Sequence, residues 1–263
     1  MDSSAEANSW SSFSPVPFGG YICGFEKQEV LIQLPFFYFA GDSLAMDDIS
    51  HIALCGDDAE LDCKFLQMLK PKRDEKSPHV LSTLVFHAVL PSAGVYRVNK
   101  IQISLHDKRT IVKPLGNIMF EVRQESQWSD EMIFASEFMI NQRDYSVIKV
   151  TYENKNSDTV EITDVSYPDD LYSNVSIRKY ADLECSMPEE GLQIPAGEKR
   201  TFVFSFEPEK NYFSEEENAF LFLLPFVEFS SGAMTDAVPM QSQPLVIQPA
   251  FSESFIEKLL EAS

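Results

Sequence analysis

The sequence predicts a mostly β protein of two β-sandwich domains with a short C-terminal helix. Three observations support this fold class. Strand-like segments follow one another from Tyr21 onward, turn signals rich in Gly, Pro, Asn and Asp separate them, and helical periodicity is confined to the last residues. The chain has 263 residues, of which 44% are hydrophobic and 24% charged, which is enough apolar material for a packed core. This length fits one large domain or two smaller ones, and the pattern along the chain favours two.

The first predicted sandwich covers residues 21–125, after a flexible polar segment at 1–20. Its expected strands are 30–40, 51–55, 61–69, 79–90, 98–105, 110–112 and 117–122. In 98–105 the apolar residues largely alternate with Lys100 and Gln102, as a half-buried strand requires. Gly116 predicts a bend or bulge between the last two segments, and the polar stretch 70–78 predicts an exposed loop.

The second half repeats this style with clearer alternation. Its expected strands are 147–154, 159–165, 192–194, 201–206, 219–229 and 233–247. Phe202, Phe204 and Phe206 fall on one face of their strand. The last two segments predict a hairpin across residues 230–232.

Residues 130–249 resemble the immunoglobulin-like β-sandwich domains of bacterial surface and exported proteins. The likeness is carried by the strand 147–154 with its Asn-rich turn, by the turn 194–198 before an aromatic strand, and by the final hairpin. It is a likeness of layout, since the inter-sheet cysteine pair and core tryptophan of antibody domains have no counterpart. It implies a sandwich architecture and a binding or scaffolding role, and the first half looks like a second sandwich of similar origin.

The boundary between the two domains is expected in the polar bridge 123–130, so that the second domain covers 130–263. Trp128 interrupts this bridge, and it either packs between the domains or binds a ligand. After the second sandwich, Ser254 and Glu257 form a possible capping box for a helix that carries Phe255, Leu259 and Leu260. This helix is expected to fold against its own domain, with a docking handle for a partner as the alternative.

The charge excludes two classes of partner. The chain has 41 acidic and 21 basic residues, a formal net charge of −20, and a pI near 4.5. Unspecific binding to nucleic acid depends on Lys and Arg, so a DNA or RNA partner is disfavoured. An anionic membrane surface also repels such a chain.

Localisation is inferred from the first residues and from the apolar runs. A spanning helix needs roughly 20 apolar residues, and the runs 30–40 and 219–227 are shorter and interrupted. The opening residues lack the basic start and apolar stretch of a signal peptide. Met1 is therefore either the start of a cytosolic protein or an addition to a mature fragment. We expect an extracytoplasmic protein whose leader has been removed, in preference to a cytoplasmic one.

The four cysteines, Cys23, Cys55, Cys63 and Cys185, include one local disulfide candidate. Cys55 and Cys63 could face one another across the turn 56–60. The alternative is that they are small buried hydrophobic residues, the commonest fate of a free cysteine. No C-x-x-C pair or Cys/His cluster supports a structural zinc site.

No metal site is predicted elsewhere. His79 and His87 share one expected strand and would be roughly 26 Å apart, too far to bind one ion. Asp58, Glu60 and Asp62 resemble calcium ligands, but Cys63 and Leu69 stand where an EF-hand needs Gly and Glu. A calcium site made with another loop stays open, and the acidic run 215–217 is read as solvated surface.

The sequence predicts no catalytic residue and no cofactor. It contains no G-x-S-x-G elbow and no glycine-rich phosphate loop. The chain carries 21 Phe, 9 Tyr and 2 Trp, clustered at 36–39 and 220–222, so some of these rings need cover from outside their own core. A domain interface and a binding surface are the two options.

The predicted function is accordingly a non-catalytic binding or scaffolding module that recognises a protein partner. Two alternatives are kept, an accessory carbohydrate-binding protein and a hydrolase with a carboxylate-based site. An exposed row of aromatic residues would favour the first alternative, and a cleft with a raised carboxyl pKa would favour the second.

Overall fold

The computed structural model describes residues 10, 12–40, 45–57, 59–69, 78–125, 132–141, 146–167, 172–180, 192–208, 220–240, 244–247 and 253–261. The elements are β1 (Ser14–Pro15), β2 (Phe18–Phe25), β3 (Glu29–Phe39), the short 3-10 helix η1 (Met46–Asp48), β4 (Ile49–Cys55), β5 (Glu60–Leu69), β6 (His79–Val89), β7 (Gly94–Leu105), β8 (Thr110–Arg123), β9 (Met132–Asn141), β10 (Ser146–Asn154), β11 (Val160–Ser166), β12 (Tyr172–Tyr180), β13 (Gln193–Ile194), β14 (Lys199–Pro208), β15 (Phe220–Leu224), β16 (Phe226–Ser231), β17 (Met234–Pro239), β18 (Leu245–Ile247) and α1 (Glu253–Glu261). The predicted class, mostly β with one short C-terminal α-helix, is confirmed.

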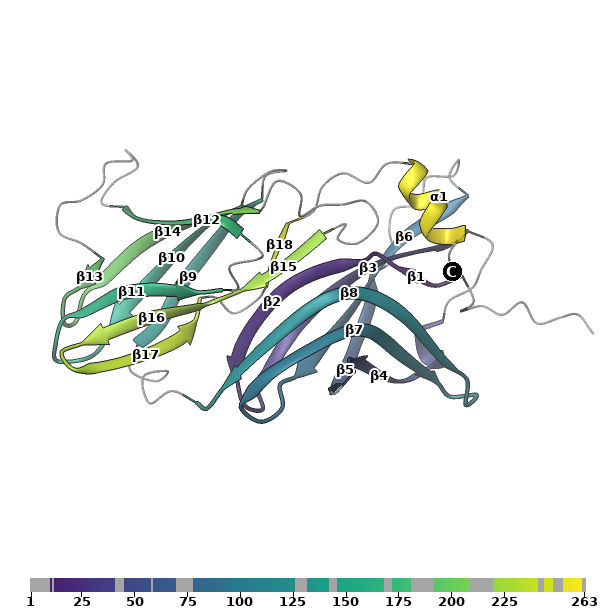
Figure 1. The fold of residues 1–263 in the computed structure, drawn as a ribbon, viewed down its shortest axis with the longest axis horizontal. Coiled ribbons are helices and arrows are strands. Elements are labelled where there is room, and N and C mark those ends of the chain that lie inside the picture. Colours follow the sequence, from purple (N-terminus) through teal and green to yellow (C-terminus); the bar gives the residue numbers. More distant parts are fainter. Residues whose placement is uncertain are drawn as a thin grey trace, which may run out of the picture.

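One ten-stranded sheet dominates the structure. Its strand order is β1-β3-β6-β5-β4-β7-β8-β2-β15-β18, and Figure 1 shows that it is strongly curled. Neighbours are antiparallel except at β2, which pairs in parallel with both β8 and β15. The strands up to Arg123 thus form a single continuous sheet. Two separate immunoglobulin-like sandwich domains, as the sequence predicted, are not confirmed.

The large sheet has a buried inner face and a polar outer face. In β4 and β5, Ile52, Leu54 and Leu61 are at most 1% exposed, whereas the flanking Glu60 and Asp62 are exposed. This alternation follows from the period of two along a strand, which sends successive side chains to opposite faces. The curl brings the inner faces of the strands together around one core.

A glycine sits at the point where β8 bends. Gly116 has a φ of +104°, and the pairing of β7 with β8 shifts register nearby, between Val98 and Lys100. A Cβ atom at Gly116 would lie 2.3 Å from the carbonyl oxygen of Phe18 on β2. The bulge predicted at this glycine is confirmed, and it allows β2 to approach the backbone of β8.

Two smaller four-stranded antiparallel sheets follow. Their orders are β12-β14-β10-β9 and β13-β11-β16-β17. The two sheets pack on each other through Tyr152 of β10 and Phe229 of β16, whose rings meet edge to face with centroids 5.3 Å apart. This packing is consistent at a coarse level with the β-sandwich architecture that the sequence predicted.

The long hairpin expected from 219–229 and 233–247 is wrong as a single unit. Only β16 and β17 form a hairpin, across Gly232. Before Pro225, β15 belongs to the large sheet, where it pairs with β2 on one side and with β18 on the other. A chain segment of the second half therefore completes the sheet of the first half. The boundaries 21–125 and 130–263 stay predictions, and Trp128 lies outside the described residues.

The C-terminal helix packs on the large sheet. α1 contacts β3, and its Phe255 and Leu260 are 5% and 7% exposed. The helical pattern predicted at the end of the chain is confirmed. Figure 1 shows α1 at the end of the molecule that holds the large sheet, far from the two smaller sheets. Within the described residues, no helix is long and apolar enough to cross a membrane.

Candidate functional site

The aromatic clusters that the sequence singled out are largely buried. Phe220, Leu221 and Phe222 are at most 1% exposed. β15 is covered on both faces, since Phe220 and Phe222 pack with Phe18 while the alternate side chains face the other way. In the cluster 36–39, Phe36 and Phe37 are buried and only Phe39, at the end of β3, is 43% exposed. Most of these rings therefore contribute to packing.

The proposed disulfide between Cys55 and Cys63 is not formed. Both cysteines are free, and so is Cys23, whereas Cys185 lies outside the described residues. The register explains this result, because Cys55 pairs with Glu60 and Cys63 pairs with Ile52. Three positions separate Glu60 from Cys63, so the two cysteines fall on opposite faces of the hairpin. Cys63 is the small buried residue of the alternative, and Cys55 is half-buried.

His79 and His87 occupy opposite ends of β6, as the sequence predicted. The Nδ1 atom of His87 lies 2.8 Å from a carboxylate oxygen of Glu29 on β3. Lys64 adds its ammonium group 3.8 Å from the same carboxylate. This trio is an exposed ion-pair network on the outer face of the large sheet.

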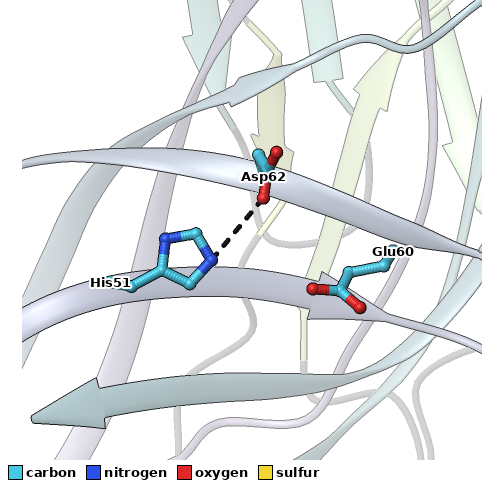
Figure 2. Close-up of side chains that lie close together, drawn as sticks. All are labelled: His51, Glu60 and Asp62. Atoms are coloured by element: carbon cyan, nitrogen blue, oxygen red, sulfur yellow. Dashed lines mark ion pairs between the residues drawn. The ribbon is translucent and has the colours of Figure 1, made fainter.

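A different histidine has two acidic neighbours. His51 on β4 lies beside Asp62 on β5, with 3.5 Å between Nε2 and the carboxylate oxygen Oδ1. Glu60 points to the same place, and the nearest ligand atoms of the three side chains all lie within 4.8 Å of one another (Figure 2). We call His51, Glu60 and Asp62 the outer-face cluster. Among the described residues, it is the one group of three His, Cys, Asp or Glu side chains whose ligand atoms lie this close together.

The strand register creates this cluster. β4 and β5 form a hairpin in which Ala53 pairs with Asp62 and Cys55 pairs with Glu60. His51 is therefore diagonal to Asp62 on the same face, a position within reach of a long side chain. The alanine between His51 and Cys55 is small and leaves the space above it to these polar groups. The sequence predicted strands at 51–55 and 61–69 and placed Glu60 in the turn between them. It did not connect His51 with Glu60 and Asp62, because the register was not known.

Cys55 borders the outer-face cluster. Burial raises the pKa of the Cys55 thiol, and the negative charge of Glu60 raises it further, while Lys100 on β7 acts in the opposite direction. The thiol is therefore mostly protonated at neutral pH. Cys55 pairs with Glu60, so it lies at the same end of the β4–β5 hairpin as this acid of the cluster.

A recess lies beside the turn that joins β4 to β5. It has a volume of about 410 Å³ and is lined by Asp57, Ala59, Val95, Tyr96, Arg97, Val98, Asn99 and Asn117. The hairpin turn closes tightly on β7 here, because a Cβ atom at Gly56 would lie 1.9 Å from the carbonyl oxygen of Arg97. Gly56 thus lets the turn lie directly against β7.

One polar atom in the recess is unsatisfied. Asn99 is the single β7 residue opposite the bulge of β8, where Val98 pairs with Ile118 and Lys100 pairs with Pro114. Its side-chain oxygen Oδ1 is buried and has no hydrogen-bond partner among the residues that the structure describes. A buried acceptor without a donor costs free energy, so a ligand that supplies an N–H or O–H group would be stabilised here. Val95, which also lines the recess, is 59% exposed and offers an apolar contact.

No protein-family model matches the chain, and no curated protein matches it. Among solved structures, the chain is similar to a secreted serine protease, VesC from Vibrio cholerae, with 6% sequence identity and a TM-score of 0.22. The match covers 82% of this chain and 49% of the protease chain. A likeness at this level transfers neither fold nor activity.

Proposed function

We propose that the protein is a non-catalytic binding or scaffolding module that recognises a protein partner. The recess beside the β4–β5 turn carries this proposal, since it combines an unsatisfied buried acceptor with an exposed aliphatic side chain. The proposed ligand is an extended segment of the partner. The side chain of Asn99 would turn its buried Oδ1 toward the recess to accept from a backbone N–H group of this segment. An apolar side chain of the segment would cover Val95.

The exposed apolar residues favour a protein over a sugar. Within the described part of the chain, the large hydrophobic side chains that are exposed are Phe39, Leu66, Leu69, Val95, Val112 and Met234. Only one of them is aromatic, whereas sugar-binding platforms use exposed Tyr or Trp. Aliphatic side chains at the edge of a recess are typical of protein contacts.

The hydrolase alternative receives no support from the described carboxyl groups. A general acid at neutral pH needs a carboxyl group with a raised pKa. Among the acidic side chains that the structure describes, a clearly raised pKa belongs to Tyr21 and to three cysteines. None of these groups is a carboxyl group. Asp107 has a lowered pKa, since the backbone N–H of Arg109 donates to its carboxylate.

The proposal also covers the architecture of the second half and the place where the protein acts. The paired four-stranded sheets support a sandwich module, and the resemblance of residues 130–249 to immunoglobulin-like domains supports a protein that acts outside the cell. A rigid body suits this role, because the large sheet and the smaller sheets share one hydrophobic core.

A selection from a random peptide library displayed on phage tests the proposed function. Peptides enriched on the wild-type protein are expected to bind Val95→Asp more than about tenfold more weakly, since a charge replaces the apolar contact. Val112→Asp is the matched control, because Val112 is similarly exposed but lies outside the recess. Equal loss in both variants, or no enriched peptide, contradicts the proposal. Binding to an oligosaccharide array instead supports the carbohydrate alternative.

A further inference from the structure

The outer-face cluster has the donor set of a transition-metal site. An imidazole nitrogen and two carboxylate oxygens converge from two adjacent strands (Figure 2). Carboxylates alone would suit calcium or magnesium, but His51 contributes a nitrogen donor that these hard cations do not use. Imidazole combined with carboxylate suits zinc. We propose that His51, Glu60 and Asp62 bind a zinc ion.

The geometry fits tetrahedral zinc. Metal–ligand bonds of about 2.1 Å at a tetrahedral angle place two ligand atoms about 3.4 Å apart. His51 Nε2 and Asp62 Oδ1 are 3.5 Å apart. These two atoms therefore need almost no movement to share an ion. Glu60 is exposed and brings its carboxylate in by a side-chain rotation.

The backbone beneath the cluster is held in place. Ile52, Ala53 and Leu54, which follow His51 on β4, are fully buried, and Leu61 between the two acids on β5 is 1% exposed. β4 also pairs with β7 on its other side, so it is an interior strand of the sheet. The donors are thus presented by rigid strands, which lowers the ordering cost of binding an ion.

The charges around the cluster also favour a cation. Glu60 and Asp62 place two carboxylate groups next to the imidazole of His51. Lys64, the nearest lysine on β5, has its ammonium group 3.8 Å from Glu29, so it is drawn toward the neighbouring strands. Lys100 faces Cys55 across the β4–β7 pair, and Arg97 lines the recess beside the same hairpin end.

The outer-face cluster contains three donors, which leaves an open position on a four-coordinate ion. Structural zinc sites are usually closed by four protein ligands, whereas an open position is filled by water or by a donor from another molecule. The proposed site is therefore an exposed, exchangeable one. This inference is independent of the peptide recess, because the two sites share no residue.

Calorimetric titration of the wild-type protein with zinc chloride tests the proposal. Saturable binding of one ion is expected, and His51→Ala and Asp62→Asn are each expected to weaken it more than about tenfold. His87→Ala is the matched control, since His87 is also a histidine beside a glutamate on the outer face. All of these side chains are partly exposed, and equal melting temperatures of the metal-free variants will verify that each one folds.

A second readout locates the ion. In NMR spectra of the full chain, zinc is expected to shift the ring signals of His51 and to leave those of His87 unchanged. Absence of saturable zinc binding overturns the proposal. So does zinc binding that is unaffected by His51→Ala, which would place the ion elsewhere. Tighter binding of calcium than of zinc overturns it as well, because calcium does not use the imidazole.

Discussion

The guanidinium group of Arg123 lies over the ring of Phe226, with 4.3 Å between its central carbon and the ring centroid. Arg123 ends β8 in the large sheet, and Phe226 begins β16 in one of the smaller sheets. The same guanidinium donates to Glu121 at 2.8 Å and lies 3.6 Å from Glu228. One side chain of the large sheet thus reaches a smaller sheet through a cation–π contact with Phe226 and an ion pair with Glu228.

Removal of this side chain is expected to loosen the junction. Arg123→Ala loses the cation–π contact and two partly exposed ion pairs, which together contribute about 1–2 kcal/mol to the free energy of unfolding. Arg109→Ala is the control, since Arg109 makes an exposed local pair with Asp107, and a smaller loss is expected there. Urea unfolding measures both values. An equal loss in the two variants would show that the contact with Phe226 does not stabilise the junction.

The hydrogen bond from Tyr21 to Glu121 predicts a loss of stability in alkali. Burial raises the pKa of Tyr21 far above its ordinary value near 10, and the hydrogen bond to the Glu121 carboxylate, at 2.5 Å, raises it further. Below pH 10 both the folded and the unfolded chain carry the neutral phenol. Above that pH only the unfolded chain loses the proton, so the free energy of unfolding falls as the pH rises.

Tyr21→Phe isolates this effect. The variant lacks the hydrogen bond and is expected to be less stable than the wild type by about 1 kcal/mol at neutral pH. It also lacks the ionisable phenol, so this difference is expected to shrink or reverse at roughly pH 11. Urea unfolding at both pH values gives the comparison. Parallel stability curves for the two proteins would contradict the assignment to Tyr21.

The bulge of β8 predicts unequal costs for two glycine substitutions. Gly116→Ala combines a left-handed φ with a Cβ atom 2.3 Å from the Phe18 carbonyl oxygen, and a loss of about 3–4 kcal/mol is expected. Gly197→Ala also has a positive φ, but nothing lies within 4 Å of the added Cβ. It is expected to cost about 1–2 kcal/mol, the backbone strain alone. Thermal unfolding separates the two, and similar melting temperatures would refute the steric account of Gly116.

Local pattern was sufficient to predict strands but not their partners. The alternation in residues 98–105 and the apolar face of the terminal helix are local signals, and both elements are present. The parallel pairing of Phe18 with Phe220 joins residues far apart in sequence. Every residue of β15 is apolar and buried, so period-two alternation could not show which face belongs to which layer. The tertiary contact alone decides that β15 leaves the expected hairpin.

The outer-face cluster was missed for a related reason. The sequence placed Glu60 inside the turn, but Glu60 is the first residue of β5 and pairs with Cys55. A shift of one residue would have moved Asp62 to the inner face, away from His51. Residue types alone therefore do not identify the cluster. An expected turn of four residues, 56–59, would have paired Cys55 with Glu60 and so placed His51, Glu60 and Asp62 on one face. The recess lies beside the β8 bulge that Gly116 predicted, but the sequence could not show that Asn99 and the β4–β5 turn would meet there.

The thiols differ in burial, which predicts an order of alkylation. Burial raises the pKa of the Cys63 thiol to about 12, and it raises the pKa of the fully buried Cys23 thiol as well. Cys55 is half-buried and its pKa is raised less far from the ordinary range. Since the thiolate is the reactive form, Cys55 is expected to react with iodoacetamide well before the other two. Mass spectrometry of digested samples, taken at successive times from a Cys185→Ser background, measures the order.

A matched experiment in urea separates burial from intrinsic chemistry. In the unfolded chain the three thiols have the same surroundings, so their alkylation rates are expected to converge. The folded-state order then reports how often β2 and β5 open, because Cys23 and Cys63 lie in these interior strands. If Cys63 reacted as fast as Cys55 in the folded protein, the β4–β5 hairpin would open readily. A rigid presentation of His51 and Asp62 would then be excluded.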